Sequence, residues 1–229
     1  SSEMRQLMKT SFLSPILFAC CLIGFHSLLS RAEAPPSLTP EEAKEGFVPL
    51  FNNKDLTGFK EVQGRPGAFR VEDGVLIGRR EGGHAYWLST ENKYGDFELR
   101  LQYMLKENGN SGIFVRVPNH IGRTSARGME IQLQDDSKRT GKPTEKDTGS
   151  IYRVSASTKF VSRKPGEWND LAIKCEGSKV KVTHNGELIN DFDMDSREET
   201  KNRPREGFIG LSAHTDDVRF RNIRIHVLK

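Results

Sequence analysis

The chain has 229 residues, which is enough for one large domain with a buried core of its own. Hydrophobic residues make up 35% of it and charged residues 29%, the composition of a soluble globular protein. The net charge is only +4 and the two signs are interspersed, apart from a short basic stretch at Arg219–Arg224 that is typical of a solvated strand face. The charge pattern therefore predicts no nucleic-acid partner.

Residues 1–34 have the pattern of a secretory signal peptide. Two basic residues precede an interrupted apolar run, Phe12–Leu29, and the small-x-small triplet Ala32-Glu33-Ala34 follows it. The run is short and broken for a transmembrane helix, which favours a cleaved signal over an uncleaved anchor. We therefore expect an exported protein, periplasmic or extracellular, with no membrane span in its mature form.

Two of the three cysteines lie within this leader. Cys20 follows a segment that weakly resembles a lipoprotein processing site, but the apolar run continues past it, so lipid anchoring at Cys20 stays an open alternative. Cys175 is then the single thiol of the mature domain and can form no intramolecular disulfide. Its place in an alternating strand pattern predicts a buried, inert side chain.

Residues 35–45 read as a linker with one or two helical turns. Thr39 is a suitable N-cap, Pro40 fits the first turn, and acidic residues follow. The remaining 46–229 are expected to form one domain.

This domain has the pattern of an antiparallel β-sandwich. Alternating apolar residues predict strands with one buried face, and Asp-Gly and Asn-Gly pairs predict hairpin turns. No stretch after residue 46 has a helical period, and no β-α alternation suggests a parallel sheet. The expected fold is all-β, two antiparallel sheets packed as a sandwich or jelly roll. The clearest strands are Phe97–Tyr103, Met129–Leu133 and Leu171–Cys175, and the hairpins are Asp73-Gly74 and Asn185-Gly186.

One predicted strand carries a row of polar side chains. Its apolar residues face the core, so Glu130, Gln132 and Gln134 share the other face, and Asp135 ends the strand. A carboxylate beside amides can bind sugar hydroxyls, or place an acid or base next to a reacting carbon. An ordinary solvated face is the alternative.

A second polar strand runs from Asn110 to Arg116. Strict alternation places Gly112, Phe114 and Arg116 on one face. If this strand pairs with the one that carries Glu130, Arg116 is expected to lie across from Glu130 or Gln132. It would then orient that carboxylate or donate to a substrate oxygen. A surface pair between strands is the alternative.

Trp168 and His214 are further candidates. Trp168 precedes a strand and is either a platform for sugar stacking or an anchor at the rim of the core. His214 ends a strand and is either a general base, a metal ligand or a structural residue. The other histidines that follow the leader show no metal-ligand spacing, and the sequence has no phosphate loop or Gly-x-Ser-x-Gly nucleophile motif.

Taken in order, several segments resemble the 3-keto-disaccharide hydrolase family, also described as 3-ketoglycoside lyase/hydratase domains, within the concanavalin A-like lectin/glucanase superfamily. Each segment is a weak signal alone, but their order and spacing over residues 45–228 are specific. They are Gly46–Phe59, Tyr94–Leu99, Asn110–Arg116, Gly128–Gln132 with Asp135, Gly149–Tyr152, Gly166–Asn169, Asn185-Gly186 and Phe220–Ile225.

The resemblance implies a concanavalin-like jelly roll with a sugar-binding groove. It also implies cleavage of glycosides that a separate sugar 3-dehydrogenase has oxidised at carbon 3. A base removes the proton on carbon 2, donors stabilise the enediolate, the group on carbon 1 leaves, and water adds back. On this mechanism Glu130 is the first acid/base candidate and His214 the second. The candidates for holding substrate are Asn110, Arg116, Gln132, Asp135, Tyr152 and Trp168.

No cofactor is required, although a divalent cation bound by Glu130, Asp135 and His214 could stabilise the enediolate. Two other functions remain open. Glucanases of this fold carry Glu-x-Asp-x-x-Glu, where this chain has Glu130, Gln132 and Asp135, and a retaining mechanism needs two close carboxyl groups. A carbohydrate-binding module without catalysis would keep the groove and need no acid or base.

Overall fold

The structure is a computed structural model that describes residues 38–84 and 86–229, so the expected signal peptide and Cys20 lie outside the described residues. The described part begins with a short helix, α1 (Pro40–Glu45). Thr39 caps it, because its side chain accepts a hydrogen bond from the Glu42 N–H while Glu42 accepts one from the Thr39 N–H. The predicted helix start is confirmed.

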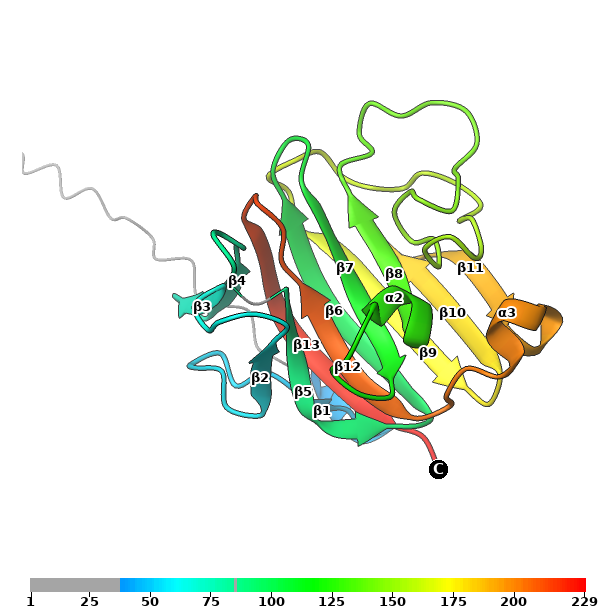
Figure 1. The fold of residues 1–229 in the computed structure, drawn as a ribbon, viewed down its shortest axis with the longest axis horizontal. Helices are drawn as coiled ribbons and strands as arrows, with labels where there is room; N and C mark the ends of the chain where they lie inside the picture. The colour runs from blue at the N-terminus through cyan, green and yellow to red at the C-terminus, as the bar shows by residue number, and fades with distance from the viewer. Residues whose placement is uncertain (1–37, 85) are drawn as a thin grey trace, which may run out of the picture. The chain divides into compact units, whose positions relative to one another are not determined.

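Two antiparallel sheets make up the body of the described residues, as the alternation predicts (Figure 1). Within this part of the chain one sheet has eight strands in the order β11-β10-β9-β6-β13-β4-β3, with β1 also paired to β13, and the other has five in the order β2-β5-β12-β7-β8. The strands of the eight-stranded sheet are β1 (Val48–Pro49), β3 (Phe69–Glu72), β4 (Val75–Gly78), β6 (Phe97–Leu105), β9 (Asn169–Glu176), β10 (Lys179–His184), β11 (Glu187–Asp193) and β13 (Val218–Val227). Those of the five-stranded sheet are β2 (Phe59–Val62), β5 (Trp87–Tyr94), β7 (Asn110–Val117), β8 (Met129–Gln134) and β12 (Gly207–Ser212).

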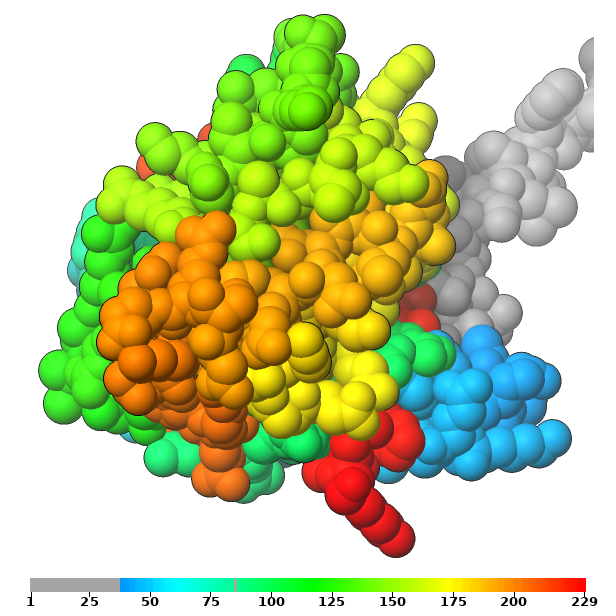
Figure 2. Space-filling model, turned by 90° about the vertical axis from the view of Figure 1, so that its right-hand side faces the viewer, coloured from blue at the N-terminus to red at the C-terminus, as the bar shows by residue number. Residues whose placement is uncertain are grey.

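Short helical turns connect some of the strands: α2 (Thr124–Arg127), the 3₁₀ turn η1 (Met194–Ser196) and α3 (Glu198–Lys201). None of the helices in the described ranges is long and apolar enough to cross a membrane. The space-filling view shows the yellow-green loop between β8 and β9 above the orange turns of η1 and α3 (Figure 2). In the same view the blue N-terminal segment and the red C-terminal strand lie side by side, because β1 pairs with β13.

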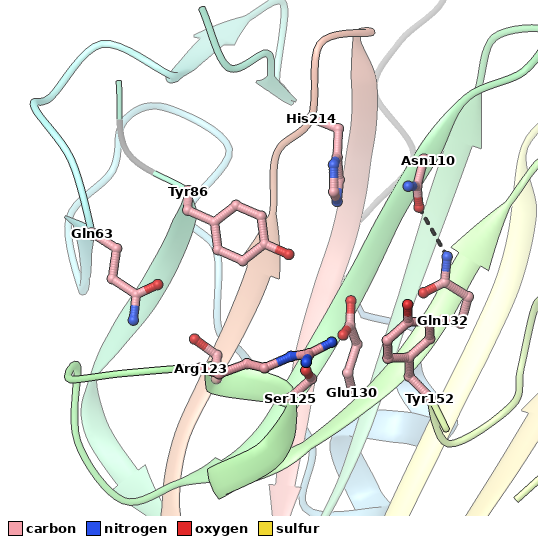
Figure 3. A pocket seen from close by; sticks show the side chains of 10 residues that line it. Gln63, Tyr86, Asn110, Arg123, Ser125, Glu130, Gln132, Tyr152 and His214 are labelled. Atoms are coloured by element: carbon pink, nitrogen blue, oxygen red, sulfur yellow. Dashed lines mark hydrogen bonds between the residues drawn. The ribbon is translucent and has the colours of Figure 1, made fainter. Parts of the chain in front are cut away.

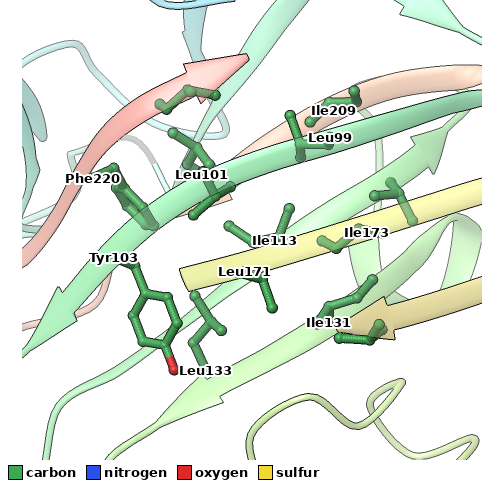
Figure 4. Close-up of a cluster of buried hydrophobic side chains, with 14 of the residues drawn as sticks. Leu99, Leu101, Tyr103, Ile113, Ile131, Leu133, Leu171, Ile173, Ile209 and Phe220 are labelled. Carbon is green, nitrogen blue, oxygen red and sulfur yellow. The ribbon is translucent and has the colours of Figure 1, made fainter. Parts of the chain in front are cut away.

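The core lies between the facing sides of the two sheets (Figure 4). Alternate residues of β6 and β9 on one sheet meet alternate residues of β7, β8 and β12 on the other. Burial of this much aliphatic and aromatic surface is the main driving force for the sandwich. Leu99, Leu101, Ile113, Ile131, Leu133, Leu171 and Ile173 are typical members, each no more than 2% exposed.

Both predicted hairpins are present. Asp73 and Gly74 join β3 to β4 with φ angles of 49° and 77°, and Asn185 and Gly186 join β10 to β11 with 48° and 85°. Two consecutive positive φ angles are the requirement of the turn that matches strand twist, and Asn-Gly and Asp-Gly meet it at least cost.

Arg116 does not follow the predicted alternation. Between β12 and β7, Phe208 pairs with Val117 and Gly210 with Phe114, so β7 has one residue more than its partner, a β-bulge. Arg116 lies in this bulge with a φ of 54°. The expectation that it shares a face with Gly112 and Phe114 is therefore wrong.

The Arg116 side chain is instead fully buried, at 0% exposure, and joins the two sheets. Its guanidinium donates to the carbonyl oxygens of Gly95 and Gly177 and forms an ion pair with Asp96 at 2.8 Å. Gly177 lies in the turn between β9 and β10, on the opposite sheet. Arg116 is thus a structural bridge.

Candidate functional site

The five-stranded sheet carries a pocket of about 300 Å³ on the face turned away from the core. Alternation explains the side: Met129, Ile131 and Leu133 face the core, so the residues between them face outward. An apolar cluster outside the main core supports this face, with Phe114 edge-on to Trp87 at 5.5 Å between ring centres. The pocket is lined by Gln63, Tyr86, Asn110, Arg123, Thr124, Ser125, Glu130, Gln132, Tyr152 and His214 (Figure 3).

Glu130 lies on β8 with only 6% of its surface exposed. Within residues 38–84 and 86–229, no hydrogen bond or ion pair reaches its carboxyl group. Burial raises its pKa to about 7, although the positive charge of Arg123 opposes this shift. Glu130 is therefore an acid/base group that can change its charge near neutral pH.

Gly112 leaves open the space that the Glu130 carboxyl occupies. The two residues are diagonal neighbours, since Phe114 pairs with Glu130 and Gly112 with Gln132. A Cβ atom at position 112 would lie 2.5 Å from Glu130 Oε1, closer than atoms can approach. Only glycine leaves room here for the carboxyl to lie over the neighbouring strand.

Tyr86 and His214 form one side of the pocket, with ring centres 5.6 Å apart in an edge-on arrangement. Tyr86 directly precedes β5, and His214 follows β12, where its carbonyl oxygen accepts a hydrogen bond from the Arg80 N–H. Burial and the charge of Glu130 raise the pKa of Tyr86 to about 12, and burial and Arg80 lower the pKa of His214. At neutral pH the pair is a neutral hydroxyl donor and a neutral imidazole.

The opposite side is formed by Asn110, Gln132 and Tyr152. Gln132 donates a hydrogen bond to the Asn110 side-chain oxygen at 2.9 Å, across the β7–β8 pair. Tyr152 belongs to the loop after β8, which folds back along that strand: its N–H donates to the Glu130 carbonyl at 2.8 Å. The loop residue Tyr152 is thereby fixed beside Glu130 (Figure 3).

The segment from Asn119 to Gly128 forms the remaining wall and contributes Arg123. In Figure 3 the Arg123 guanidinium points toward the Glu130 carboxyl. No ion pair joins the two, and no other group among the described residues hydrogen-bonds to this guanidinium. The pocket thus holds an unpaired base and an unpaired cation on neighbouring walls.

Five of the predicted site residues meet in this pocket, and three do not. The first group is Asn110, Glu130, Gln132, Tyr152 and His214. The register places Gly112 and Phe114 opposite Gln132 and Glu130, so the expectation that Arg116 lies there is wrong. Asp135 and Trp168 also lie outside the pocket.

Asp135 and Trp168 have local partners instead. The Asp135 carboxyl accepts hydrogen bonds from the Asn108 N–H and from Ser137, which hold the end of β8. Trp168 precedes β9 in the eight-stranded sheet and packs under the Arg221 guanidinium, 4.0 Å from its ring centre. These contacts place both side chains away from the pocket walls.

The pocket does not assemble the three metal ligands that the sequence suggested. Asp135 is separated from Glu130 and His214, and the described ranges contain no group of three or more His, Cys, Asp or Glu side chains that could hold a metal ion. The three residues therefore do not fit a shared cation.

Several lining residues were missed by sequence reasoning: Gln63, Tyr86, Arg123, Thr124 and Ser125. All lie in loops or short helical turns between strands or just before a strand, where no periodic sequence pattern indicates the direction of a side chain. No motif or periodic pattern in the sequence singles out these five residues.

The arrangement offers one carboxylate that titrates near neutrality, surrounded by hydroxyl, amide, imidazole and guanidinium groups. Glu130 is the one carboxylate among the described lining residues. Such a site can move a proton and hold oxygen-rich ligands, but it lacks the second nearby carboxyl that a retaining glycosidase uses.

The comparisons with known proteins agree with the fold and indicate a protein related to glycoside hydrolases. A "3-keto-disaccharide hydrolase" from Bacteroides thetaiotaomicron is 24% identical over 90% of this chain and 86% of its own length. A crystal structure from Parabacteroides distasonis, described as a candidate glycosyl hydrolase, is 27% identical with a TM-score of 0.73, covering 84% of this chain and 98% of that one. A Bacillus subtilis protein with a galectin-like fold superposes with a TM-score of 0.56 at 12% identity, over 79% and 94% of the two chains, which supports the expected jelly roll.

The sequence pattern of one family covers nearly the whole sandwich. It is described as the 3-keto-alpha-glucoside-1,2-lyase-like domain, and it matches residues 46–226. The pocket residues from Gln63 to His214 all fall within this range. The chain therefore belongs to the family of 3-keto-alpha-glucoside-1,2-lyase-like domains.

Proposed function

We propose that this protein cleaves the glycosidic bond of 3-keto-glycosides by elimination followed by hydration, with Glu130 as the base. Membership of the family and the relative named a hydrolase indicate a glycoside-cleaving enzyme. The keto substrate and the elimination step are the proposal.

The observation that carries it is the state of Glu130. A buried carboxyl without a hydrogen-bond partner is unfavourable for folding, and its pKa of about 7 makes it an effective base at neutral pH. Elimination beside a ketone needs one such base. The pocket supplies one carboxyl and many donors, which suits this chemistry better than a mechanism with two carboxyl groups.

The steps balance without an added oxidant or reductant. Glu130 takes the proton from carbon 2, and the C–H electron pair forms a double bond to carbon 3, placing negative charge on the ketone oxygen. The electron pair on that oxygen then re-forms the ketone, and the electrons of the double bond between carbons 2 and 3 move to form a double bond between carbons 1 and 2. At the same time the bond from carbon 1 to the leaving oxygen breaks. Water then adds to carbon 1 and a proton to carbon 2, so the sum is hydrolysis.

His214 is the second acid/base group of this proposal. A neutral imidazole carries one N–H donor and one free lone pair. It can therefore donate a hydrogen bond to the leaving oxygen, which takes the proton that Glu130 gained from carbon 2, and its lone pair can accept a proton from the incoming water and pass it to carbon 2. Asn110, Gln132 and Tyr152 have the amide and hydroxyl groups to hold sugar hydroxyls.

The test compares a 3-keto-disaccharide with its unoxidised parent, with and without added divalent cation, and follows the products by mass spectrometry. We expect wild type to cleave the keto sugar alone, and Glu130→Gln to bind it without turnover. Glu91→Gln, on an exposed position of β5, is the matched control and keeps full activity. Cleavage of the parent would instead indicate an ordinary glycosidase, and binding without any cleavage would indicate a carbohydrate-binding module.

We also propose that the protein is exported through residues 1–34, on the basis of the sequence pattern there. Expression of the full chain in a bacterial host is expected to yield a product processed near Ala34 in the periplasm or medium, detected by N-terminal sequencing. An unprocessed product that stays in the cytoplasm would contradict this.

The proposed chemistry further implies a separate sugar 3-dehydrogenase, because the substrate must already carry a ketone at carbon 3 before elimination can begin. In a coupled assay, the unoxidised disaccharide is expected to be cleaved only when such a dehydrogenase and its electron acceptor are added. Cleavage without them would contradict the dependence.

A further inference from the structure

We infer that Arg123 holds the oxygen on carbon 3 of the substrate and stabilises the negative charge that forms there when Glu130 removes the neighbouring proton. This inference rests on the proposed function and deepens it, because it names the group that recognises the ketone. It fills the role for which the sequence suggested Arg116, a residue that the structure uses to bridge the two sheets.

The first argument is the absence of partners. The guanidinium of Arg123 and the carboxyl of Glu130 face each other in Figure 3, yet no ion pair connects them, and no group in the described ranges hydrogen-bonds to either. Both side chains line one pocket, and Arg123 is exposed to solvent, so its guanidinium is open to a ligand. A ligand that offers a proton to Glu130 and an oxygen to Arg123 would pair with both groups.

Thr124 provides an independent observation on the same wall. It is only 3% exposed, it lines the pocket, and its hydroxyl oxygen has no hydrogen-bond partner within residues 38–84 and 86–229. Buried hydroxyls are normally satisfied. Among the described residues of this wall, the hydroxyl next to Arg123 in the chain is thus a second polar group that the fold leaves without a partner.

The wall that carries Arg123 is held in place from several sides. The Gln63 side chain donates to the carbonyl oxygens of His120 and Gly122, immediately before Arg123. Arg127 donates to the Ile121 carbonyl, and Arg203 donates to the carbonyl of Gly128 at the end of the segment. These contacts fix the backbone that carries Arg123, and the preorganisation that favours a developing charge therefore lies in the position of this wall.

The chemistry of guanidinium matches a ketone. Arginine has five N–H donors and no acceptor, so it pairs with an oxygen that only accepts. A ketone oxygen is such a group, and it accepts more strongly as it becomes an enediolate oxygen. Carbons 2 and 3 are bonded to each other, so the base for one and the donor for the oxygen of the other must be neighbours, as Glu130 and Arg123 are.

The test measures cleavage of a 3-keto-disaccharide by the full protein and its Arg123→Gln and Arg123→Lys variants. We expect Arg123→Gln to lower kcat by about 100-fold to 1,000-fold, the usual cost of losing one oxyanion donor, with a smaller change in KM. Arg123→Lys restores part of kcat because it keeps the charge. Arg219→Gln, an exposed arginine of the other sheet, is the control and leaves kcat unchanged.

The pH profile separates this role from a structural one. The charge of Arg123 lowers the pKa of Glu130, so its removal raises that pKa and shifts the acidic limb of kcat to higher pH in Arg123→Gln but not in Arg123→Lys. An Arg123→Gln variant with kcat within threefold of wild type, or with an unshifted limb, would overturn the inference while leaving the proposed function intact. A wild-type protein that does not cleave the keto sugar would overturn both.

Discussion

Two glutamates of nearly equal burial have opposite surroundings in this molecule. Glu42 on α1 is 7% exposed, and Glu130 in the pocket is 6% exposed. The Glu42 carboxyl accepts hydrogen bonds from Arg100, Arg224 and the Thr39 backbone, which outweigh its burial and lower its pKa. Glu130 has no such partner, and burial raises its pKa to about 7. Burial alone therefore does not decide what a carboxyl does; its partners do.

The arginines repeat the contrast. Arg116 is fully buried and bonded to both sheets, whereas Arg123 faces the pocket without a partner. Arg116 and Glu42 hold parts of the sandwich together, whereas Glu130 and the solvent-exposed Arg123 line one pocket on the five-stranded sheet. A buried carboxyl without a partner, as at Glu130, is an unfavourable arrangement of the kind that natural proteins accept where function requires it.

Replacing Glu130, the buried glutamate without a partner, is expected to have the largest effect on turnover. We expect Glu130→Gln to reduce turnover of a 3-keto-glycoside by a thousandfold or more, about 4 kcal/mol. The same change should stabilise the fold at high pH. A folded pKa of about 7 above the model value of 4.5 means that ionising Glu130 in the folded state costs about 3 kcal/mol.

The size of this effect on stability depends on pH. The folded-state pKa is raised, so wild type loses stability as pH rises from about 4.5 through 7, and the variant does not. Urea denaturation should give equal stabilities at pH 4 and a more stable variant at pH 8. A variant less stable than wild type at pH 8 would show that Glu130 has a structural partner.

Replacing Arg116 tests the role of a buried charged group that has partners. Arg116→Met should lower the free energy of unfolding by about 3 kcal/mol, because it leaves the carbonyls of Gly95 and Gly177 and the Asp96 carboxylate without their donor. Thermal unfolding measures the loss. Sugar affinity at a temperature where the variant is folded should be unchanged, and a selective loss of affinity would place Arg116 in the site after all.

Glu42→Gln is expected to cost about 2 kcal/mol at neutral pH, since two arginines lose a charged acceptor. The pKa of Glu42 is lowered, so its contribution is complete above about 4.5 and disappears as pH falls through the folded-state value. The difference between wild type and variant in urea denaturation should therefore shrink in acid. A difference that grows in acid would contradict the account.

The smallest expected effect tests the space around Glu130. A Cβ at position 112 would meet the carboxyl at 2.5 Å, so Gly112→Ala should turn the side chain away and lower kcat about tenfold, with little loss of stability. Gly58→Ala is not a suitable control, because its φ of 87° adds strain. Gly95→Ala is better, since its Cβ would have its nearest contact at 3.9 Å.

The fold could be predicted because its signals are local and repeated. Alternation in β6, β8 and β9 marks buried faces, and the Asp-Gly and Asn-Gly pairs fix two hairpins. The same alternation correctly placed Glu130 and Gln132 on one outward face. It failed at Arg116, because a one-residue bulge there reverses the direction of the side chain. No turn residue in the sequence indicates this bulge.

The rest of the site could not be predicted because loops between the strands form it. Arg123 and Tyr152 reach the pocket through loops whose paths are set by distant partners, Gln63 for one and the backbone of β8 for the other. Asp135 follows the outward row in sequence, yet hydrogen bonds to Asn108 and Ser137 hold it at the strand end. Spacing along the chain contains no information on such contacts.

The most direct measurement of the central claim is exchange at carbon 2. Wild type and Glu130→Gln are incubated with a 3-keto-disaccharide in deuterium oxide near pH 7, and the products are analysed by mass spectrometry and NMR against an enzyme-free control. If Glu130 removes the proton, wild type releases a keto sugar with deuterium at carbon 2, and the variant gives only the spontaneous background. Cleavage by wild type with hydrogen retained at carbon 2, or unchanged exchange in the variant, would contradict the account.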